Sequence, residues 1–304
     1  MSDAAVEIVD VTKRFGAKLA VDHVSFAVLR GETYGLIGPN GAGKTTTFSM
    51  MCGFLHPTTG QIRILDADPR KPGALKRKLG VLPQDAILPP NSKVGELLTY
   101  WANLSGLERP EHEARTALER VELAQTWDTR AGALSHGMAK RVAMAQALMG
   151  KPPVVLLDEP TAGLDPKIAA QVRQVIREMK GEQTVIVSSH NLQELEELCD
   201  SAAILDRGKL VQAGSMSELT AQAAEFRVQI GRGTPPVDEM KILPGVSGAT
   251  WDENTRTLLV QYDGRKHASD EVITRVLKLI IERDATIVTV SRGRKLEERV
   301  LQLT

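Results

Sequence analysis

Short runs of hydrophobic residues, some continuous and some alternating with polar ones, recur along the first two thirds of the chain. Alternation is typical of a strand with one buried face, whereas a continuous apolar run is typical of a strand buried on both faces. The predicted strands are Val6–Val11, Ala20–Leu29, Thr33–Ile37, Gly60–Asp66, Leu79–Leu82, Val154–Glu159, Thr184–Ser188, Ala202–Leu205 and Lys209–Gln212. The predicted helices among them are Thr46–Cys52, Lys167–Lys180 and Asn191–Cys199. This part of the chain is therefore predicted to have an α/β fold.

The pattern turns helical between about residues 94 and 150, where apolar residues recur at three- and four-residue spacing. Gly95–Leu104, Pro110–Val121 and Ala139–Met149 are the predicted helices of this stretch. They form a helical subdomain inserted into the α/β chain.

The pattern changes again after residue 222, which predicts a large domain over 1–222 and a small accessory domain over 223–304. Strands are predicted at Phe226–Ile230, Thr257–Tyr262 and Ala285–Ser291, with helices at Ser269–Glu282 and Lys295–Leu303. The small domain is therefore expected to be α+β. It carries no carboxylate pair or phosphate loop, so the sequence indicates no chemistry of its own.

The 304 residues are 42% hydrophobic and 25% charged, an ordinary composition for one large and one small globular domain. Lysine and arginine together number 38, as do aspartate and glutamate, so the formal net charge is +0. Because the basic surplus typical of nucleic-acid-binding proteins is missing, no nucleic acid partner is expected.

Cys52 and Cys199 both fall in predicted helices, so they are expected to be reduced and buried rather than paired. The N-terminus has neither a basic region nor an apolar run, which predicts no signal peptide. No stretch approaches the ~18 to 20 apolar residues of a membrane span. The chain is therefore expected to be cytoplasmic, and any membrane span must come from another subunit.

The stretch Gly38–Thr46 matches G-x-x-x-x-G-K-[ST], the phosphate-binding loop (P-loop), between a predicted strand and a predicted helix. Gly41 and Gly43 let successive N–H groups converge on the β-phosphate. Lys44 supplies a cation between the β- and γ-phosphates, and the Thr45 hydroxyl is placed to ligate Mg²⁺. The predicted nucleotide-binding residues of this loop are Gly38, Asn40, Gly41, Ala42, Gly43, Lys44, Thr45 and Thr46.

Two adjacent carboxylates, Asp158 and Glu159, end a predicted buried strand. The carboxyl ends of strands are where open α/β sheets bind their ligands. Adjacent strand residues point to opposite sides, so the two carboxylates are expected to have different tasks. Asp158 suits the Mg²⁺ shell, through water, and Glu159 suits polarising the attacking water.

Residue type alone leaves two interpretations open at several other positions. Phe15 either stacks on an adenine or closes the edge of the core. Gln84 is either a surface loop residue or reaches Mg²⁺ and the attacking water. Ser135 and Gly137 either begin an ordinary capped helix or offer a hydroxyl and an N–H to a phosphate. His190 follows a buried strand and is either a surface or a catalytic residue.

Together and in this order, the motifs resemble the ATP-binding cassette (ABC) family over residues 5 to about 220. In this resemblance Gly38–Thr46 is the Walker A loop and Val154–Glu159 is the Walker B strand. Leu134–Met138 resembles the signature motif, from which it departs at His136 and Met138.

The resemblance implies roles for the positions that residue type left open. Phe15 corresponds to the adenine-stacking aromatic, Gln84 to the Q-loop that senses Mg²⁺, and His190 to the switch histidine on the γ-phosphate. Glu159 corresponds to the general base. Asp165 ends the segment similar to the D-loop and is expected to be one of the nucleotide-binding residues. Catalysis is then expected to depend on Glu159, His190, Lys44 and Gln84, with Thr45, Gln84 and Asp158 serving Mg²⁺.

The resemblance also implies two copies packed head to tail around two ATP molecules. Each nucleotide then lies between the P-loop of one chain and Ser135 and Gly137 of the other.

Three features resemble the ATPase subunits of bacterial drug, ion and polysaccharide exporters that have a separate membrane permease: the Phe15-Gly16 start, the signature ending in Met138, and the closing Leu296–Thr304 stretch. Such a subunit is peripheral on the cytoplasmic face of the inner membrane. The alternative function is a soluble ABC-type ATPase acting on nucleic acid or ribosomes. Such factors usually carry two cassettes or long coiled coils, whereas this chain has a single P-loop and no sustained heptads.

Overall fold

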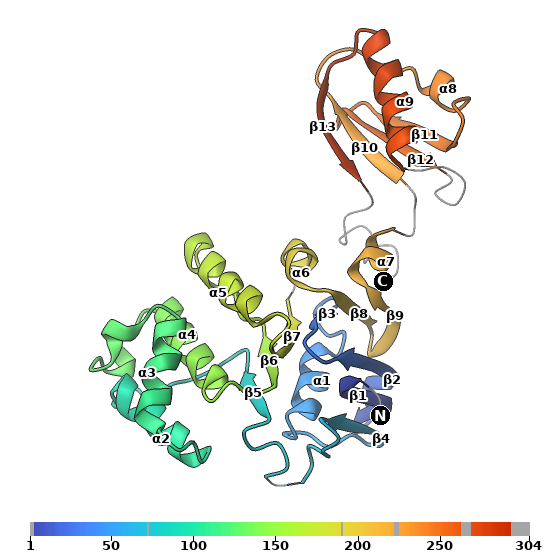
Figure 1. Cartoon of the computed structure of the whole chain (residues 1–304). Helices are drawn as coiled ribbons and strands as arrows, with labels where there is room; N and C mark the ends of the chain where they lie inside the picture. The colour runs from blue at the N-terminus through green and yellow to red at the C-terminus, as the bar shows by residue number, and fades with distance from the viewer. Residues whose placement is uncertain (1–2, 72, 190, 222–224, 263–268, 293–304) are drawn as a thin grey trace. The chain divides into compact units, whose positions relative to one another are not determined.

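The computed structural model describes residues 3–71, 73–189, 191–221, 225–262 and 269–292, and every structural statement below concerns these residues (Figure 1). The chain divides into two compact units, Met1–Met216 and Ser217–Leu303.

A six-stranded sheet with the order β5-β6-β7-β3-β8-β9 organises the first unit (Figure 1). All neighbours are parallel except β8 and β9, which form an antiparallel hairpin. The three central strands are buried at every position, as their continuous apolar runs predict. The strands are β3 (Thr33–Ile37), β5 (Leu79–Leu82), β6 (Val154–Asp158), β7 (Thr184–Ser188), β8 (Ser201–Asp206) and β9 (Lys209–Ser215).

A second, antiparallel sheet of three strands covers one side of the unit, in the order β2-β1-β4. Its strands are β1 (Ala4–Phe15), β2 (Lys18–Leu29) and β4 (Thr59–Ile64). Helix α1 (Lys44–Met51) contacts both sheets, so one hydrophobic core extends from the three-stranded sheet to the six-stranded one. β1 and β2 begin earlier than alternation alone predicts.

The helical subdomain consists of α2 (Val94–Leu104), α3 (Pro110–Arg120) and α4 (His136–Leu148), drawn in green in Figure 1. Two short 3-10 turns, Ala124–Thr126 and Ala131–Ala133, connect α3 to α4. The remaining helices of the unit, α5 (Pro166–Met179) and α6 (Leu192–Leu198), contact β7 and β3 respectively. Helix α7 (Met216–Ala221) follows β9 at the point where the chain divides into its two units.

The second unit has the β-α-β-β-α-β order of a ferredoxin-like fold, with the antiparallel sheet β11-β12-β10-β13. Its core joins Phe226, Val228 and Val260 to Val272 and Val276 of the long helix. The elements are β10 (Glu225–Ile230), α8 (Val237–Met240), β11 (Val246–Asp252), β12 (Thr257–Tyr262), α9 (Ser269–Glu282) and β13 (Ile287–Arg292).

Some predicted features of the chain need correction. Cys199 is buried and free as expected, but Cys52 is only partly buried because it follows the last residue of α1. The predicted helix Lys295–Leu303 lies outside the described residues. Within the described part of the chain, no helix combines the length and the apolar composition that crossing a membrane requires.

Candidate nucleotide-binding site

A cleft of about 660 Å³ opens above the P-loop, where β3 gives way to α1. It collects residues from five separate stretches of the first unit. Its lining residues are Lys18, Leu19, Ala20, Asn40, Gly41, Ala42, Gly43, Lys44, Thr45, Thr46, Gln84, Glu159, Ala162 and Arg207. The structure thus brings the predicted P-loop residues from Asn40 onward together with two other predicted residues, Gln84 and Glu159.

The P-loop has the backbone geometry of an anion cradle. Gly43 caps α1 with φ +101°, and no side chain bonds to the first N–H groups of the helix. A Cβ at Gly43 would lie 2.7 Å from the Ala20 carbonyl oxygen, so only glycine fits the turn. The first turn of α1 therefore presents its N–H groups to the cleft, where a phosphate fits.

Lys44 is nearly buried, with 7% of its surface exposed. Its Nζ donates to the carbonyl oxygens of Gly38 at 2.6 Å and Pro39 at 3.2 Å, which folds the side chain back along the loop. Burial lowers the pKa of Lys44, and the Glu159 and Asp158 carboxylates oppose this shift. A phosphate would supply the negative charge that the buried ammonium favours.

The two carboxylates at the end of β6 line different cavities. Glu159 lines the nucleotide cleft, whereas Asp158 lines a neighbouring groove of about 200 Å³. Both are buried, at 7% and 5% exposure. Burial raises the pKa of Asp158, and a hydrogen bond from the Ser188 hydroxyl opposes the shift.

Ser188 holds this strand end together, and sequence reasoning identified it only as the last residue of a strand. Its hydroxyl donates to Asp158 and accepts from the Glu159 backbone N–H at 3.0 Å. Glu159 has φ +50°, outside the strand conformation, and its N–H also lies 3.2 Å from the Ser188 carbonyl oxygen. A hydroxyl at the end of an otherwise apolar strand was the signal that could have found it.

Thr45, Gln84 and Asp158 line one groove, the neighbour of the nucleotide cleft. A hydroxyl, a carboxamide and a carboxylate are oxygen donors of the kind that Mg²⁺ takes, usually together with water and phosphate. The described residues hold no cluster of three or more His, Cys, Asp or Glu side chains suited to a metal. The donor set therefore fits a cation held jointly with phosphate, not an all-protein cage.

Gln84 is connected to the helical subdomain through its backbone. The Lys140 Nζ of α4 donates to the Gln84 carbonyl oxygen at 2.7 Å, and burial lowers the pKa of Lys140. This contact joins two segments 56 residues apart, and the sequence alone did not indicate it.

Phe15 ends β1 and stays 46% exposed, with the Lys13 ammonium 5.0 Å from the centre of its ring. It does not line the cleft itself, but its strand partner Lys18 does. Phe15 is therefore the direct strand neighbour of a residue that lines the cleft.

Three other predicted residues, Ser135, Gly137 and Asp165, lie at helix starts outside the cleft. Ser135 is exposed and caps α4, its hydroxyl accepting from the Met138 N–H at 3.3 Å. Asp165 caps α5, and its carboxylate accepts from the Lys167 and Ile168 N–H groups at 3.1 Å each. Gly137 lies against Leu164, so the two helix starts are adjacent. His190 lies outside the described residues.

Comparison with known proteins decides the family. The family model described as ABC transporter matches residues 21–162. The Nod factor export ATP-binding protein I of Burkholderia orbicola is 37% identical over 219 residues, covering 71% of this chain and 72% of that protein. The linearmycin resistance ATP-binding protein LnrL of Bacillus subtilis is 35% identical over 217 residues, covering 70% of each.

The chain belongs to the ABC transporter family. It is an ATP-binding subunit and an ATPase, and it has the fold of ABC nucleotide-binding domains. A solved ATP-binding subunit of an ABC transporter has 30% sequence identity and a TM-score of 0.66, covering 71% of this chain and 91% of that one. A dimeric ATP-binding cassette with ADP and phosphate bound has 25% identity and a TM-score of 0.63, covering 69% and 98%.

Proposed function

We propose that two copies of this ABC ATPase close head to tail around ATP and thereby drive a separate membrane permease. We expect export as the direction of transport, because the Nod factor relative of this chain is named for export. The observation that carries the proposal is the position of Ser135 and Gly137. Both begin α4 outside the cleft formed by the P-loop of their own chain. An exposed, capped helix start of this kind is available to the nucleotide of a second copy. ATP binding then completes a site that neither chain encloses alone.

Within each site the residues divide the work of phosphoryl transfer, which is mostly positioning and charge neutralisation. The P-loop N–H groups and Lys44 hold the β- and γ-phosphates. Glu159 acts as general base on the attacking water, and its backbone is fixed for this by Ser188. His190 contacts the γ-phosphate, and Phe15 stacks on the adenine at the mouth of the cleft. Asp165 keeps the D-loop against the signature helix of the same chain.

Mg²⁺ fits beside the nucleotide, held by Thr45, Gln84 and, through water, Asp158. When bound, it neutralises charge that develops on the phosphates. Burial raises the pKa of Asp158 although Lys44 and Lys140 favour its charged form, so a bound cation would stabilise this carboxylate further.

The groove that Thr45, Gln84 and Asp158 line also has an apolar part, and we assign this part to the permease. Phe48, Val81 and Leu82 line it together with Phe54, whose side chain is 71% exposed. Exposed aromatic surface next to a groove is typical of a protein interface. Because Gln84 lines both this groove and the nucleotide cleft, closure around ATP can be transmitted to the bound subunit. The ATPase is then peripheral on the cytoplasmic face of the membrane.

The test is to purify a tagged Glu159→Gln chain from membranes solubilised with ATP present, and to identify its partners. We expect a membrane protein with several spans, because the slowed chain keeps the ATP-bound assembly together. Ribosomes or nucleic acid in place of a membrane protein would favour the soluble ATPase.

Two further variants locate the docking surface. Phe54→Ser is expected to lose the membrane subunit while keeping the basal ATPase rate of the purified chain. The matched control is Leu29→Ser, which removes an apolar side chain, 52% exposed, from β2. Equal retention of the membrane subunit by both variants would contradict docking at the groove.

A further inference from the structure

The turn between β8 and β9, residues Asp206–Lys209, lies directly against the P-loop. The Gly208 N–H donates to the Ala42 carbonyl oxygen at 3.1 Å, and the Gly208 carbonyl accepts from the Asp22 N–H at 2.8 Å. Gly208 has φ +82°, and a Cβ there would lie 2.8 Å from the Ala20 carbonyl oxygen. The turn is therefore joined through its backbone to both β2 and the nucleotide-binding loop.

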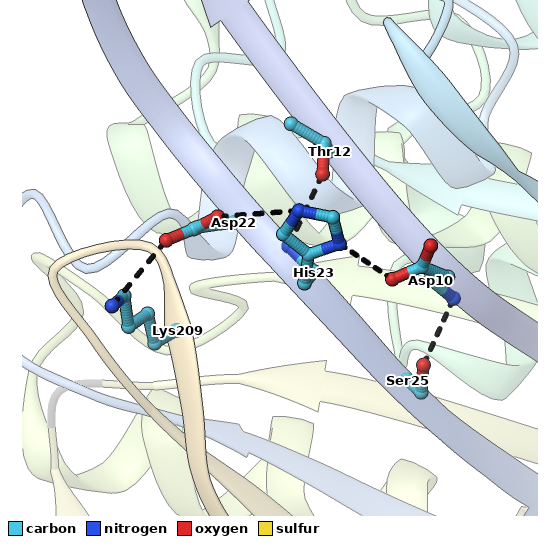
Figure 2. A network of polar contacts seen from close by, with 6 residues as sticks. All are labelled: Asp10, Thr12, Asp22, His23, Ser25 and Lys209. Atoms are coloured by element: carbon cyan, nitrogen blue, oxygen red, sulfur yellow. Dashed lines mark hydrogen bonds and ion pairs between the residues drawn. The ribbon is translucent and has the colours of Figure 1, made fainter.

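Side chains reinforce this attachment, as Figure 2 shows. The Lys209 ammonium lies 3.5 Å from one Asp22 carboxylate oxygen, and the other oxygen lies 4.0 Å from His23 Nε2. His23 Nδ1 in turn is 2.6 Å from the Asp10 carboxylate on β1. Lys209 thus points toward β2 and the surface of the three-stranded sheet. Its ammonium group pairs with Asp22 and so helps to attach the turn to β2.

Arg207, the other cation of the turn, lines the nucleotide cleft. Its side chain is 87% exposed, and its Nε lies 3.7 Å from the carboxylate of its neighbour Asp206. An exposed ion pair of this length is weak, so the guanidinium is available to a stronger anion. The backbone of Arg207 is fixed while its side chain can reorient.

The order of the strands in the six-stranded sheet indicates which part of a bound nucleotide Arg207 faces. The P-loop follows β3, Glu159 follows β6, and Arg207 follows β8. In the sheet, β6 lies two strands to one side of β3, whereas β8 is the adjacent strand on the other side. Neighbouring strands are about 4.8 Å apart, which separates the two strand ends by about 14 Å. The P-loop lies between them, so the γ-phosphate near Glu159 points away from Arg207.

We propose that Arg207 is a nucleotide-binding residue that contacts the part common to ATP and ADP, the phosphate next to the ribose. A guanidinium presents several N–H donors in a fixed plane, which suits two oxygens of one phosphate. This inference rests on nucleotide binding at the cleft and on neither the dimer nor the permease. It uses the proposed place of Glu159 beside the γ-phosphate, whereas failure of the dimer or of the permease would leave it standing.

The test is calorimetric binding of Mg-ATP and Mg-ADP to the full chain and to two alanine variants. Arg207→Ala is expected to raise the Kd for both nucleotides about tenfold, the effect of one charge-assisted contact. The KM for ATP should rise with the Kd, because the lost contact is equal before and during reaction. Arg207→Lys is expected to recover part of the affinity.

Lys209→Ala is the matched control, since it removes a cation from the same turn that points away from the cleft. It should leave both Kd values within about twofold, a difference too small for a direct phosphate contact. Three outcomes would overturn the proposal: unchanged affinities in Arg207→Ala, weaker ATP binding with unchanged ADP binding, or an equal loss in Lys209→Ala. Thermal unfolding without nucleotide checks that each variant is folded. If Arg207→Ala is not folded, Arg207→Gln takes its place in the binding measurements.

Discussion

Removing the Ser188 hydroxyl tests how the end of β6 is held. Ser188 is fully buried, and Ser188→Ala deletes one oxygen without leaving a large cavity. The main loss is the hydrogen bond to the buried Asp158 carboxylate. A bond to a charged group contributes about 1.5–3 kcal/mol. For a unit of this size, a loss of about 2 kcal/mol lowers Tm by about 4–8 °C.

The effect should depend on pH with a definite sign. Burial raises the pKa of Asp158 in the folded chain above the value in the unfolded chain. The folded chain therefore loses stability as the pH rises from the unfolded-state pKa through the folded-state pKa, because the buried carboxyl becomes charged. The Ser188 hydroxyl offsets part of that loss only while Asp158 is charged. The difference between Ser188→Ala and the unaltered chain should therefore be large at neutral pH and shrink in acid, toward the ~1 kcal/mol of a neutral bond.

The assay is heat unfolding followed by tryptophan fluorescence across a series of pH values. Trp101 and Trp127 lie in the first unit, so a Trp251→Phe background restricts the signal to it. Ser25→Ala is the control, because that exposed hydroxyl accepts only a surface N–H, from Asp10. A Tm difference that stays constant from acid to neutral pH would refute the reasoning, as would no difference at all.

Three further predictions follow from individual contacts. Glu159→Gln should bind ATP but hydrolyse it at least about a hundredfold more slowly, as expected for loss of a general base, and unchanged turnover in a phosphate-release assay would exclude that role. Gly95→Ala should destabilise the helical subdomain by more than about 1 kcal/mol in urea unfolding, because a Cβ would lie 2.3 Å from the Trp127 ring; unaltered stability would contradict this packing. NMR titration should give His23 a pKa above 6.5, because Asp10 favours the imidazolium, and Asp10→Asn should lower it; the stability from this pair is then present below pH 6.5 and lost as pH rises through the raised pKa.

Local patterns predicted the centre of the fold well. β6 opens with four consecutive apolar residues, β3 and β7 are largely apolar, and the P-loop is one uninterrupted motif, so each is visible within a few residues. The start of α4 at His136, with its Ser135 cap, follows from one capping signal. The edge strand Val246–Asp252 was missed, because its serine, glycine and threonine residues break the alternation that marks a half-buried strand.

Contacts between distant segments could not be predicted in the same way. Ser188 meets Asp158 only because β7 lies beside β6, 30 residues away in sequence. Arg207 reaches the cleft only because β8 is the neighbour of β3. Strand order is a property of the folded sheet, and neither hydrophobic period nor motif spacing encodes it. These residues therefore entered the site only with the structure.

Sedimentation of the Glu159→Gln chain with and without ATP tests the head-to-tail dimer most directly. The account predicts a mass of 33.1 kDa without nucleotide and twice that mass with Mg-ATP. It also predicts that adding Ser135→Arg, at the helix start that we propose faces the partner's nucleotide, returns the chain to the single mass while ATP still binds. An unchanged mass with ATP, or an equal dimer in the Ser135→Arg variant, would contradict the composite site.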